Sequence, residues 1–202
     1  MTDKFLDKAY GTTGDTRELY SAWAKSYDEE LGSNGYATPE RCAKALAKHS
    51  KDKSAPILDF GCGTGLSGLA LKLAGFEVID GVDVTEDMLK VAAEKQIYRS
   101  LTQIEPGKPL PHAPGTYAAI TAIGVIGTGA APVSVFDLIM KGLAKGGLTV
   151  VSLNDHALED PNFEGKLNEY LDCGSARLLH KEYGPHITAI NLNSNVYVLE
   201  KT

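Results

Sequence analysis

The chain has 202 residues and a formal net charge of -6, with 43% hydrophobic and 23% charged residues. These values are ordinary for a globular enzyme, and the scattered Lys and Arg exclude a large nucleic-acid interface, which needs clustered basic residues. Three widely spaced cysteines and a start without a leader pattern predict a cytoplasmic protein.

The first fifty residues lack strand patterns, so we predict a helical N-terminal lid over residues 1–50 and a core over residues 51–202. In the lid, Thr38-Pro39-Glu40 predicts the start of a helix, with Thr38 as its N-cap and Pro39 in its first turn. An apolar and aromatic stripe predicts an earlier helix. The stripe consists of Leu19, Tyr20, Trp23, Ala24 and Tyr27.

From residue 56 onward, strand and helix patterns alternate, which is typical of a mostly parallel, doubly wound α/β sheet with helices on both faces. Two or three further strands are expected within residues 176–200, with a tight turn at Asn193-Ser194-Asn195 and an antiparallel ending. Pro and Gly interrupt the uncharged residues 109–136, so we predict a buried strand there and no membrane span. The earlier predicted strands are 57–60, 76–83, 97–104, 117–123 and 148–153, and the helices begin near residues 66, 85, 132 and 160.

The most specific motif is the loop Gly61-Cys62-Gly63-Thr64-Gly65, directly after the first predicted strand. Glycine has no Cβ, so it permits positive φ and lets a ligand lie against the main chain. A strand that ends in such a loop predicts a nucleotide-type cofactor site.

Two cofactors are compatible with this loop. Residues 63–68 fit the dinucleotide pattern G-x-G-x-x-G, and Asp83 follows at a suitable distance. However, no second domain for a hydride acceptor is evident, and Asp59, next to the loop, would repel a pyrophosphate. S-adenosylmethionine is cationic and has no phosphate, so we predict that Asp59 holds its amino-acid end and Asp83 its ribose hydroxyls.

The strings ILDFGCGTG, GVDVTEDMLKVA and LAKGGLTVVSL together resemble the class I S-adenosylmethionine-dependent methyltransferases. The string LYSAWAKSYDEELGSNGYATPE is similar to a subgroup of small methyltransferase-like proteins related to one encoded in the Williams-Beuren region. The resemblance implies a seven-stranded sheet with a reversed last strand and S-adenosyl-L-methionine as the cofactor. It places Asp59, Gly61, Gly63 and Gly65 in the first cofactor motif and Asp83 on the ribose.

The resemblance also implies an adenine site. Met88 matches an apolar residue that flanks the adenine, and Glu105 is the best match to an acid that contacts the adenine amine. Ala118-Ala119 stands where many members of the family have an acidic residue, which weakens a prediction of acid-base catalysis there. The remaining predicted cofactor contacts are Tyr27, Cys62, Val84, Ile104 and Ile123.

Methyl transfer is an in-line displacement, so positioning and exclusion of water can do most of the work. A general base is needed only if the attacking atom carries a proton. His156, after the fifth predicted strand, is our candidate for that base, and His186 is a second histidine in a suitable loop.

The sequence therefore predicts a methyltransferase that acts on a small organic molecule bound under the lid. The Asn-Pro-Pro-Tyr motif of DNA amino-group methylation is absent after the fourth predicted strand, so we expect no nucleic-acid partner, and we predict no metal site. Protein methylation, a nucleotide oxidoreductase and a catalytically silent cofactor-binding protein stay open as alternatives. The sequence determines neither the acceptor atom nor the oligomeric state.

Overall fold

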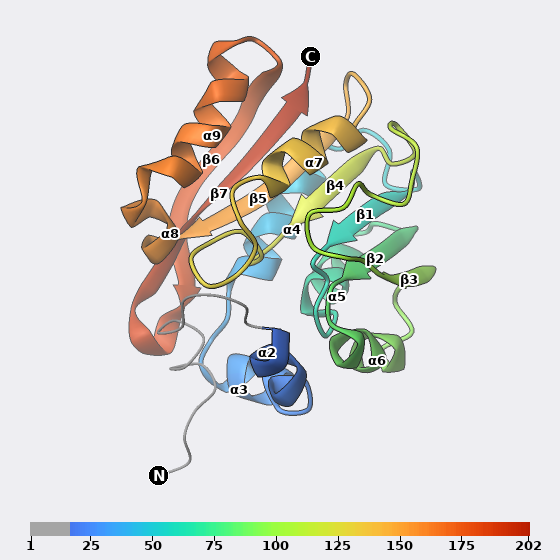
Figure 1. Cartoon of the computed structure of the whole chain (residues 1–202), viewed down its shortest axis with the longest axis vertical. Helices are drawn as coiled ribbons and strands as arrows, with labels where there is room; N and C mark the ends of the chain where they lie inside the picture. The colour runs from blue at the N-terminus through green and yellow to red at the C-terminus, as the bar shows by residue number, and fades with distance from the viewer. Residues whose placement is uncertain (1–16) are drawn as a thin grey trace.

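The computed structural model describes residues 17–202, and its centre is one seven-stranded sheet with helices on both faces (Figure 1). The strands are β1 Ile57–Phe60, β2 Ile79–Asp83, β3 Ser100–Gln103, β4 Ala119–Ala122, β5 Leu148–Asn154, β6 Ala176–Ile187 and β7 Leu192–Lys201. The helices are α2 Arg17–Trp23, α3 Tyr27–Ser33, α4 Thr38–His49, α5 Leu66–Leu73, α6 Glu86–Glu94, α7 Val135–Gly142, α8 Asp155–Glu159 and α9 Pro161–Asp172.

The strand order is β3-β2-β1-β4-β5-β7-β6, and only β7 runs against its neighbours. Strands β1 to β5 pair in parallel, whereas β7 is antiparallel to both β5 and β6. The predicted doubly wound, mostly parallel sheet with a reversed last strand is confirmed. The carboxyl ends of β1 to β5 consequently meet at one edge, where this class of sheet binds its ligands.

Both faces of the sheet are covered. In β1, Ile57 packs into a core that includes residues of α4 and α5, and Leu58 packs into a second core on the opposite face with α7 and α9. Successive side chains of a strand point to opposite faces, so a strand buried on both sides needs apolar residues throughout. This explains why the stretch around β4 carries no charge, as predicted for a buried strand. From residue 17 onward, no helix is long and apolar enough to cross a membrane.

The N-terminal helical region differs in detail from the prediction. The stripe between Leu19 and Tyr27 is divided between α2 and α3, with a turn at residues 24–26. The prediction that Thr38 caps a helix is wrong, because Ala37 occupies the N-cap position and Thr38 is the first residue of α4. The Thr38 Oγ1 instead lies 2.7 Å from His186 Nδ1 and 3.2 Å from Ser194 Oγ. This buried contact joins α4 to β6 and β7. Residues 1–16 of the predicted lid lie outside the described residues.

The predicted turn at Asn193-Ser194-Asn195 is also wrong, because these residues lie inside β7. The chain reverses earlier, through a short 3-10 helix at Thr188–Ile190 and through Asn191, which has φ of +53°. Asparagine tolerates this left-handed conformation better than most residues. Ser194 pairs with β5 on one side and β6 on the other, so strand pairing outweighs the local turn preference.

The buried His186 predicts a loss of stability in acid. Burial and the nearby Arg41 lower the pKa of His186 to about 4, whereas in the unfolded chain it titrates near 6.5. Between these values the unfolded state binds more protons, so the free energy of unfolding falls as pH drops from about 6.5 to about 4, by up to about 3 kcal/mol. Urea denaturation at a series of pH values measures this slope, and His186→Gln should flatten it.

The matched control is His156→Gln, because His156 is exposed on α8. That variant should keep the slope of the unchanged protein. Equal slopes for His186→Gln and the unchanged protein would show that His186 is not the titrating group.

Candidate functional site

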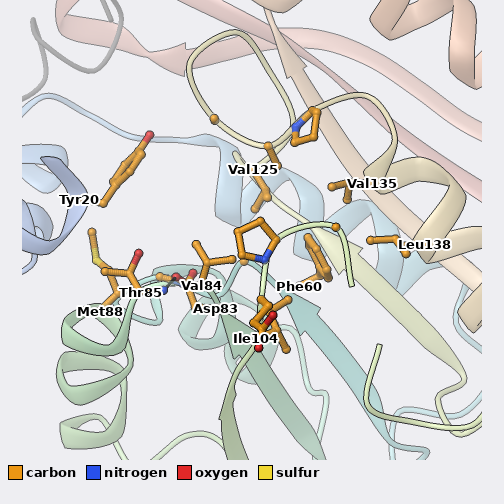
Figure 2. Close-up of a pocket in the computed structure, with 18 of the residues that line it drawn as sticks. Tyr20, Phe60, Asp83, Val84, Thr85, Met88, Ile104, Val125, Val135 and Leu138 are labelled. Atoms are coloured by element: carbon orange, nitrogen blue, oxygen red, sulfur yellow. Dashed lines mark hydrogen bonds between the residues drawn. The ribbon is translucent and has the colours of Figure 1, made fainter. Parts of the chain in front are cut away.

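A cavity of about 390 Å³ lies at the carboxyl ends of the parallel strands, and we call it the large cavity. Residues from β1, β2 and the segments after β3 and β4 line it, together with residues of α2, α3, α6 and α7. Figure 2 shows Tyr20 on one side and Val135 and Leu138 on the opposite side, with Asp83 between Met88 and Phe60. The volume lies in the range of small-molecule sites.

The glycine loop forms part of the cavity wall. The backbone N–H groups of Gly61 and Cys62 both donate to the carbonyl oxygen of Val82, which holds the loop against β2. Gly63 has φ of +53°, and a Cβ at this position would point into open space. The backbone at Gly63 is therefore not covered by a side chain where it meets the cavity. The sequence predicts this for a loop that a ligand approaches closely.

Asp83 connects the loop to the end of β2. Its Oδ2 accepts a hydrogen bond of 2.9 Å from the Gly63 N–H, and its Oδ1 accepts one of 2.8 Å from the Thr85 N–H. The residue is 8% exposed, and burial raises the pKa of its carboxyl. Each carboxylate oxygen has a further lone pair, so Asp83 can accept additional hydrogen bonds from a ligand in the large cavity.

Asp59 does not line the large cavity, although it directly precedes the loop. The side chain is fully buried behind it, where it accepts hydrogen bonds from Ser67 Oγ (2.6 Å), Tyr98 Oη (2.8 Å) and Thr121 Oγ1 (2.8 Å). Burial raises the pKa of this carboxyl, against the effect of the three donors. In this geometry Asp59 joins β1, α5 and β4 and fixes the loop from behind.

The other predicted contacts divide into two groups. Tyr27, Val84, Met88, Ile104 and Glu105 line the large cavity together with Gly61, Gly63 and Asp83. Cys62, Gly65 and Ile123 are not among its lining residues. Cys62 and Ile123 are buried in the interior, and Gly65 is the N-cap of α5 with φ of +94°.

Sequence reasoning missed one whole wall of the large cavity. This wall comes from the segment between β4 and α7 and from the first turn of α7. No local motif identifies this wall, because its residues are small or apolar. The order of the strands in the sheet places them at the cavity. The missed residues include Val125, Ala130, Ala131, Pro132, Ser134, Val135 and Leu138.

Helix α2 packs against α6, and α3 follows it in the chain (Figure 1). From here on, we call α2 and α3 the lid. Tyr20 and Tyr27 of the lid line the large cavity. Asp28 of α3 accepts a hydrogen bond of 2.5 Å from Thr64 Oγ1 in the glycine loop and pairs with Lys95 Nζ at 2.6 Å. A hydrogen bond from Ser21 to Asp87 adds a second attachment, to α6. The lid is thus fixed to the loop that it covers.

A second cavity, of about 50 Å³, lies beside the first, and we call it the small cavity. The two cavities share Tyr20, Tyr27, Gly124 and Ala130 as lining residues. His186 lines the small cavity, whereas His156 lines neither cavity and lies exposed on α8. Of the two histidines that the sequence suggests as a general base, the structure therefore places His186 at the site and His156 away from it.

Comparison with known proteins is consistent with this geometry. The methyltransferase domain family matches residues 35–192, a range that includes the glycine loop, Asp83 and most of the sheet. The chain belongs to this family. Human methyltransferase-like protein 27 is 34% identical over 117 residues, which are 56% of this chain and 48% of the human protein. The chain therefore spans about half the length of this methyltransferase relative.

Two solved structures show the same methyltransferase fold. One is a chain of the complex between the Haloferax volcanii Trm112 methyltransferase activator and a methyltransferase, with a TM-score of 0.68, 14% identity, and 93% of this chain and 99% of that chain covered. The other is a class I S-adenosylmethionine-dependent methyltransferase from Listeria monocytogenes, with a TM-score of 0.65 and 16% identity. The match covers 96% of this chain and 70% of that chain. The predicted resemblance to class I methyltransferases is confirmed.

The methyl donor of class I methyltransferases is S-adenosylmethionine, and the large cavity fits it. The carboxylate of Asp83 can accept hydrogen bonds from ribose hydroxyls. Val84, Met88 and Ile104 provide apolar walls suited to a flat base. The absence of a Cβ at Gly63 leaves room for close approach to the backbone.

Replacing Asp83 tests this fit. Asp83→Asn removes the charge and leaves one acceptor oxygen for the N–H groups of Gly63 and Thr85, so one of them loses its partner. Affinity for S-adenosylhomocysteine, measured by calorimetry, should fall about 10- to 100-fold. Glu94→Gln, an exposed change at the end of α6, should leave the affinity unaltered. An undiminished affinity of Asp83→Asn would remove the residue from the binding site.

A second variant tests the attachment of the lid. Asp28→Asn removes the ion pair with Lys95, so the lid should open more often and S-adenosylhomocysteine should dissociate about two- to fivefold faster. Stopped-flow displacement measures this rate. Glu40→Gln removes an exposed ion pair with Lys44 on α4 and serves as the control. If both variants release the ligand at the same rate, Asp28 does not hold the lid closed.

Proposed function

We propose that the chain is an S-adenosylmethionine-dependent methyltransferase whose acceptor is a small organic molecule. The observation that carries the proposal is the arrangement of the two cavities, which share a boundary under one lid. One cavity has the size and lining for the methyl donor. The other adjoins it through four shared lining residues, so an acceptor bound there would lie next to the donor.

Within this proposal, the residues of the chain bind and orient rather than react. Asp83 holds the ribose, Gly61 and Gly63 allow the ligand to lie along the loop, and Met88 and Ile104 contact the base. Bound S-adenosylmethionine supplies an activated methyl group on a sulfonium. Orientation of the two reactants in a dry site can contribute on the order of 7 to 11 kcal/mol to lowering the barrier.

Tyr20 and Tyr27 of the lid have the position to exclude water, because both line the two cavities at once. Of the sequence candidates for a base, His156 faces neither cavity. Methyl transfer here therefore depends on positioning and not on His156.

The size of the small cavity favours a small-molecule acceptor over a protein or an RNA. At about 50 Å³ it has room for a small functional group, and the lid lies over it. The net charge of -6 does not favour an RNA backbone. The Lys and Arg residues are also scattered along the sequence, which does not favour a polyanion as acceptor.

Transfer of a radiolabelled methyl group tests the proposal. The protein is incubated with S-adenosylmethionine labelled in the methyl group and with a cell extract divided into small molecules, proteins and RNA. Label should appear in the small-molecule fraction, and Asp83→Asn should strongly reduce it when the donor is below saturation. Label in protein or RNA would contradict the small-molecule acceptor. Cofactor binding without transfer to any fraction would identify a catalytically silent protein.

A further inference from the structure

Four aromatic residues contribute to the lining of the small cavity, beside aliphatic and neutral polar residues. Tyr20, Trp23, Tyr27 and Tyr36 all contribute to it, from α2, α3 and the segment before α4. The Trp23 ring stacks on Tyr20, with centroids 5.9 Å apart, and meets Tyr27 edge-on at 4.5 Å. Aromatic faces attract cations, and several rings around one small space are the usual means of holding a methylated ammonium group.

Two further contacts support this aromatic lining. The Trp23 indole Nε1–H donates a hydrogen bond of 2.8 Å to the Glu30 carboxylate, which places negative charge at the ring edge. A carboxylate in that position makes the ring more electron-rich and strengthens its attraction for a cation. Gly124 has φ of +69°, and a Cβ there would collide with the Tyr36 hydroxyl. Gly124 thus lets the Tyr36 ring come close to the end of β4.

The polar groups of the lining are neutral. Ser152 Oγ accepts a hydrogen bond from the Gly124 N–H at 2.8 Å, and Asn154 Oδ1 accepts one from the Ala157 N–H at 2.9 Å. The pKa of His186, lowered by burial to about 4, keeps its ring uncharged near pH 7. Among the described residues that line the small cavity, none carries a charge.

This lining discriminates between acceptor chemistries. A hydroxyl acceptor must give up its proton. His186 is poorly placed to take it, because its Nδ1 lies 2.7 Å from Thr38 Oγ1 and burial lowers the pKa of the ring. A neutral amine has its own lone pair and needs no base to attack. The aromatic rings then stabilise the positive charge that develops on the nitrogen.

From these contacts, and resting on the methyltransferase function proposed above, we propose that the small cavity holds the acceptor and that the acceptor is a small aliphatic amine. The amine enters in its neutral form, having released its proton to solvent. An N–C bond forms as the S–C bond breaks. The unit positive charge passes from sulfur to nitrogen, so the products are a thioether and a methylated ammonium ion.

The size of the small cavity agrees with this acceptor. A cavity needs roughly 10–15 Å³ of accessible volume to hold one water molecule. The volume of about 50 Å³ therefore holds a nitrogen with a few methyl or methylene groups.

A matched pair of probes tests the charge preference. The protein is saturated with S-adenosylhomocysteine and titrated with tetramethylammonium chloride or with tert-butanol, which has a similar shape and no charge, at constant chloride. Trp23 is the single tryptophan and lines the small cavity, so its fluorescence reports occupancy directly. Tetramethylammonium should bind about tenfold more tightly than tert-butanol. Equal affinities would overturn the amine proposal.

Variants of Tyr36 test the aromatic basis. Tyr36→Phe keeps the ring and should bind tetramethylammonium within about twofold of the unchanged protein, whereas Tyr36→Leu should bind it about tenfold more weakly. Tyr183→Leu, an exposed change on β6, is the control and should have no effect. Unchanged tetramethylammonium affinity in Tyr36→Leu would contradict the proposal. Binding of S-adenosylhomocysteine confirms that each variant is folded.

The two proposals fail in different ways. If S-adenosylhomocysteine does not bind to the unchanged protein, the proposed function is wrong. If it binds normally but tetramethylammonium has no advantage over tert-butanol, only the amine acceptor is wrong.

Discussion

The bridge from the Asp83 carboxylate to the backbone N–H groups of Gly63 and Thr85 is the interaction on which the site depends. It joins the glycine loop after β1 to the end of β2 and sets the floor of the large cavity. Asp59 fixes the same loop from behind, through Ser67, Tyr98 and Thr121. Two buried acids thus hold a loop in which three of the five residues are glycines without side chains.

The lid adds a second constraint, because Tyr20 of α2 and Tyr27 of α3 line both cavities. Asp28 fastens the lid to Thr64 of the glycine loop and to Lys95. The same helices supply Tyr20, Trp23 and Tyr27, which line the small cavity. Under the proposed function, the helices that cover the site would also select the acceptor.

Local patterns were sufficient for much of the core. Alternating strand and helix signals predict β1, β2, β4 and β5, because strands buried on both faces must be apolar throughout. Prediction failed where tertiary contacts outweigh local preference. Thr38 has the chemistry of an N-cap but is held by His186, and residues 193–195 resemble a turn but pair on both sides within β7.

The sequence by itself determined the fold class, and it predicted that the glycine loop and Asp83 lie together at the strand ends, where they line the large cavity. Glycine spacing and a strand-end acid are encoded within a few residues. Only the tertiary structure decided that Asp59 faces the interior, that His156 lies away from both cavities, and that His186 lines one. These outcomes depend on residues brought together from distant parts of the chain. The spacing of residues along the sequence does not give the distances between them in the folded chain.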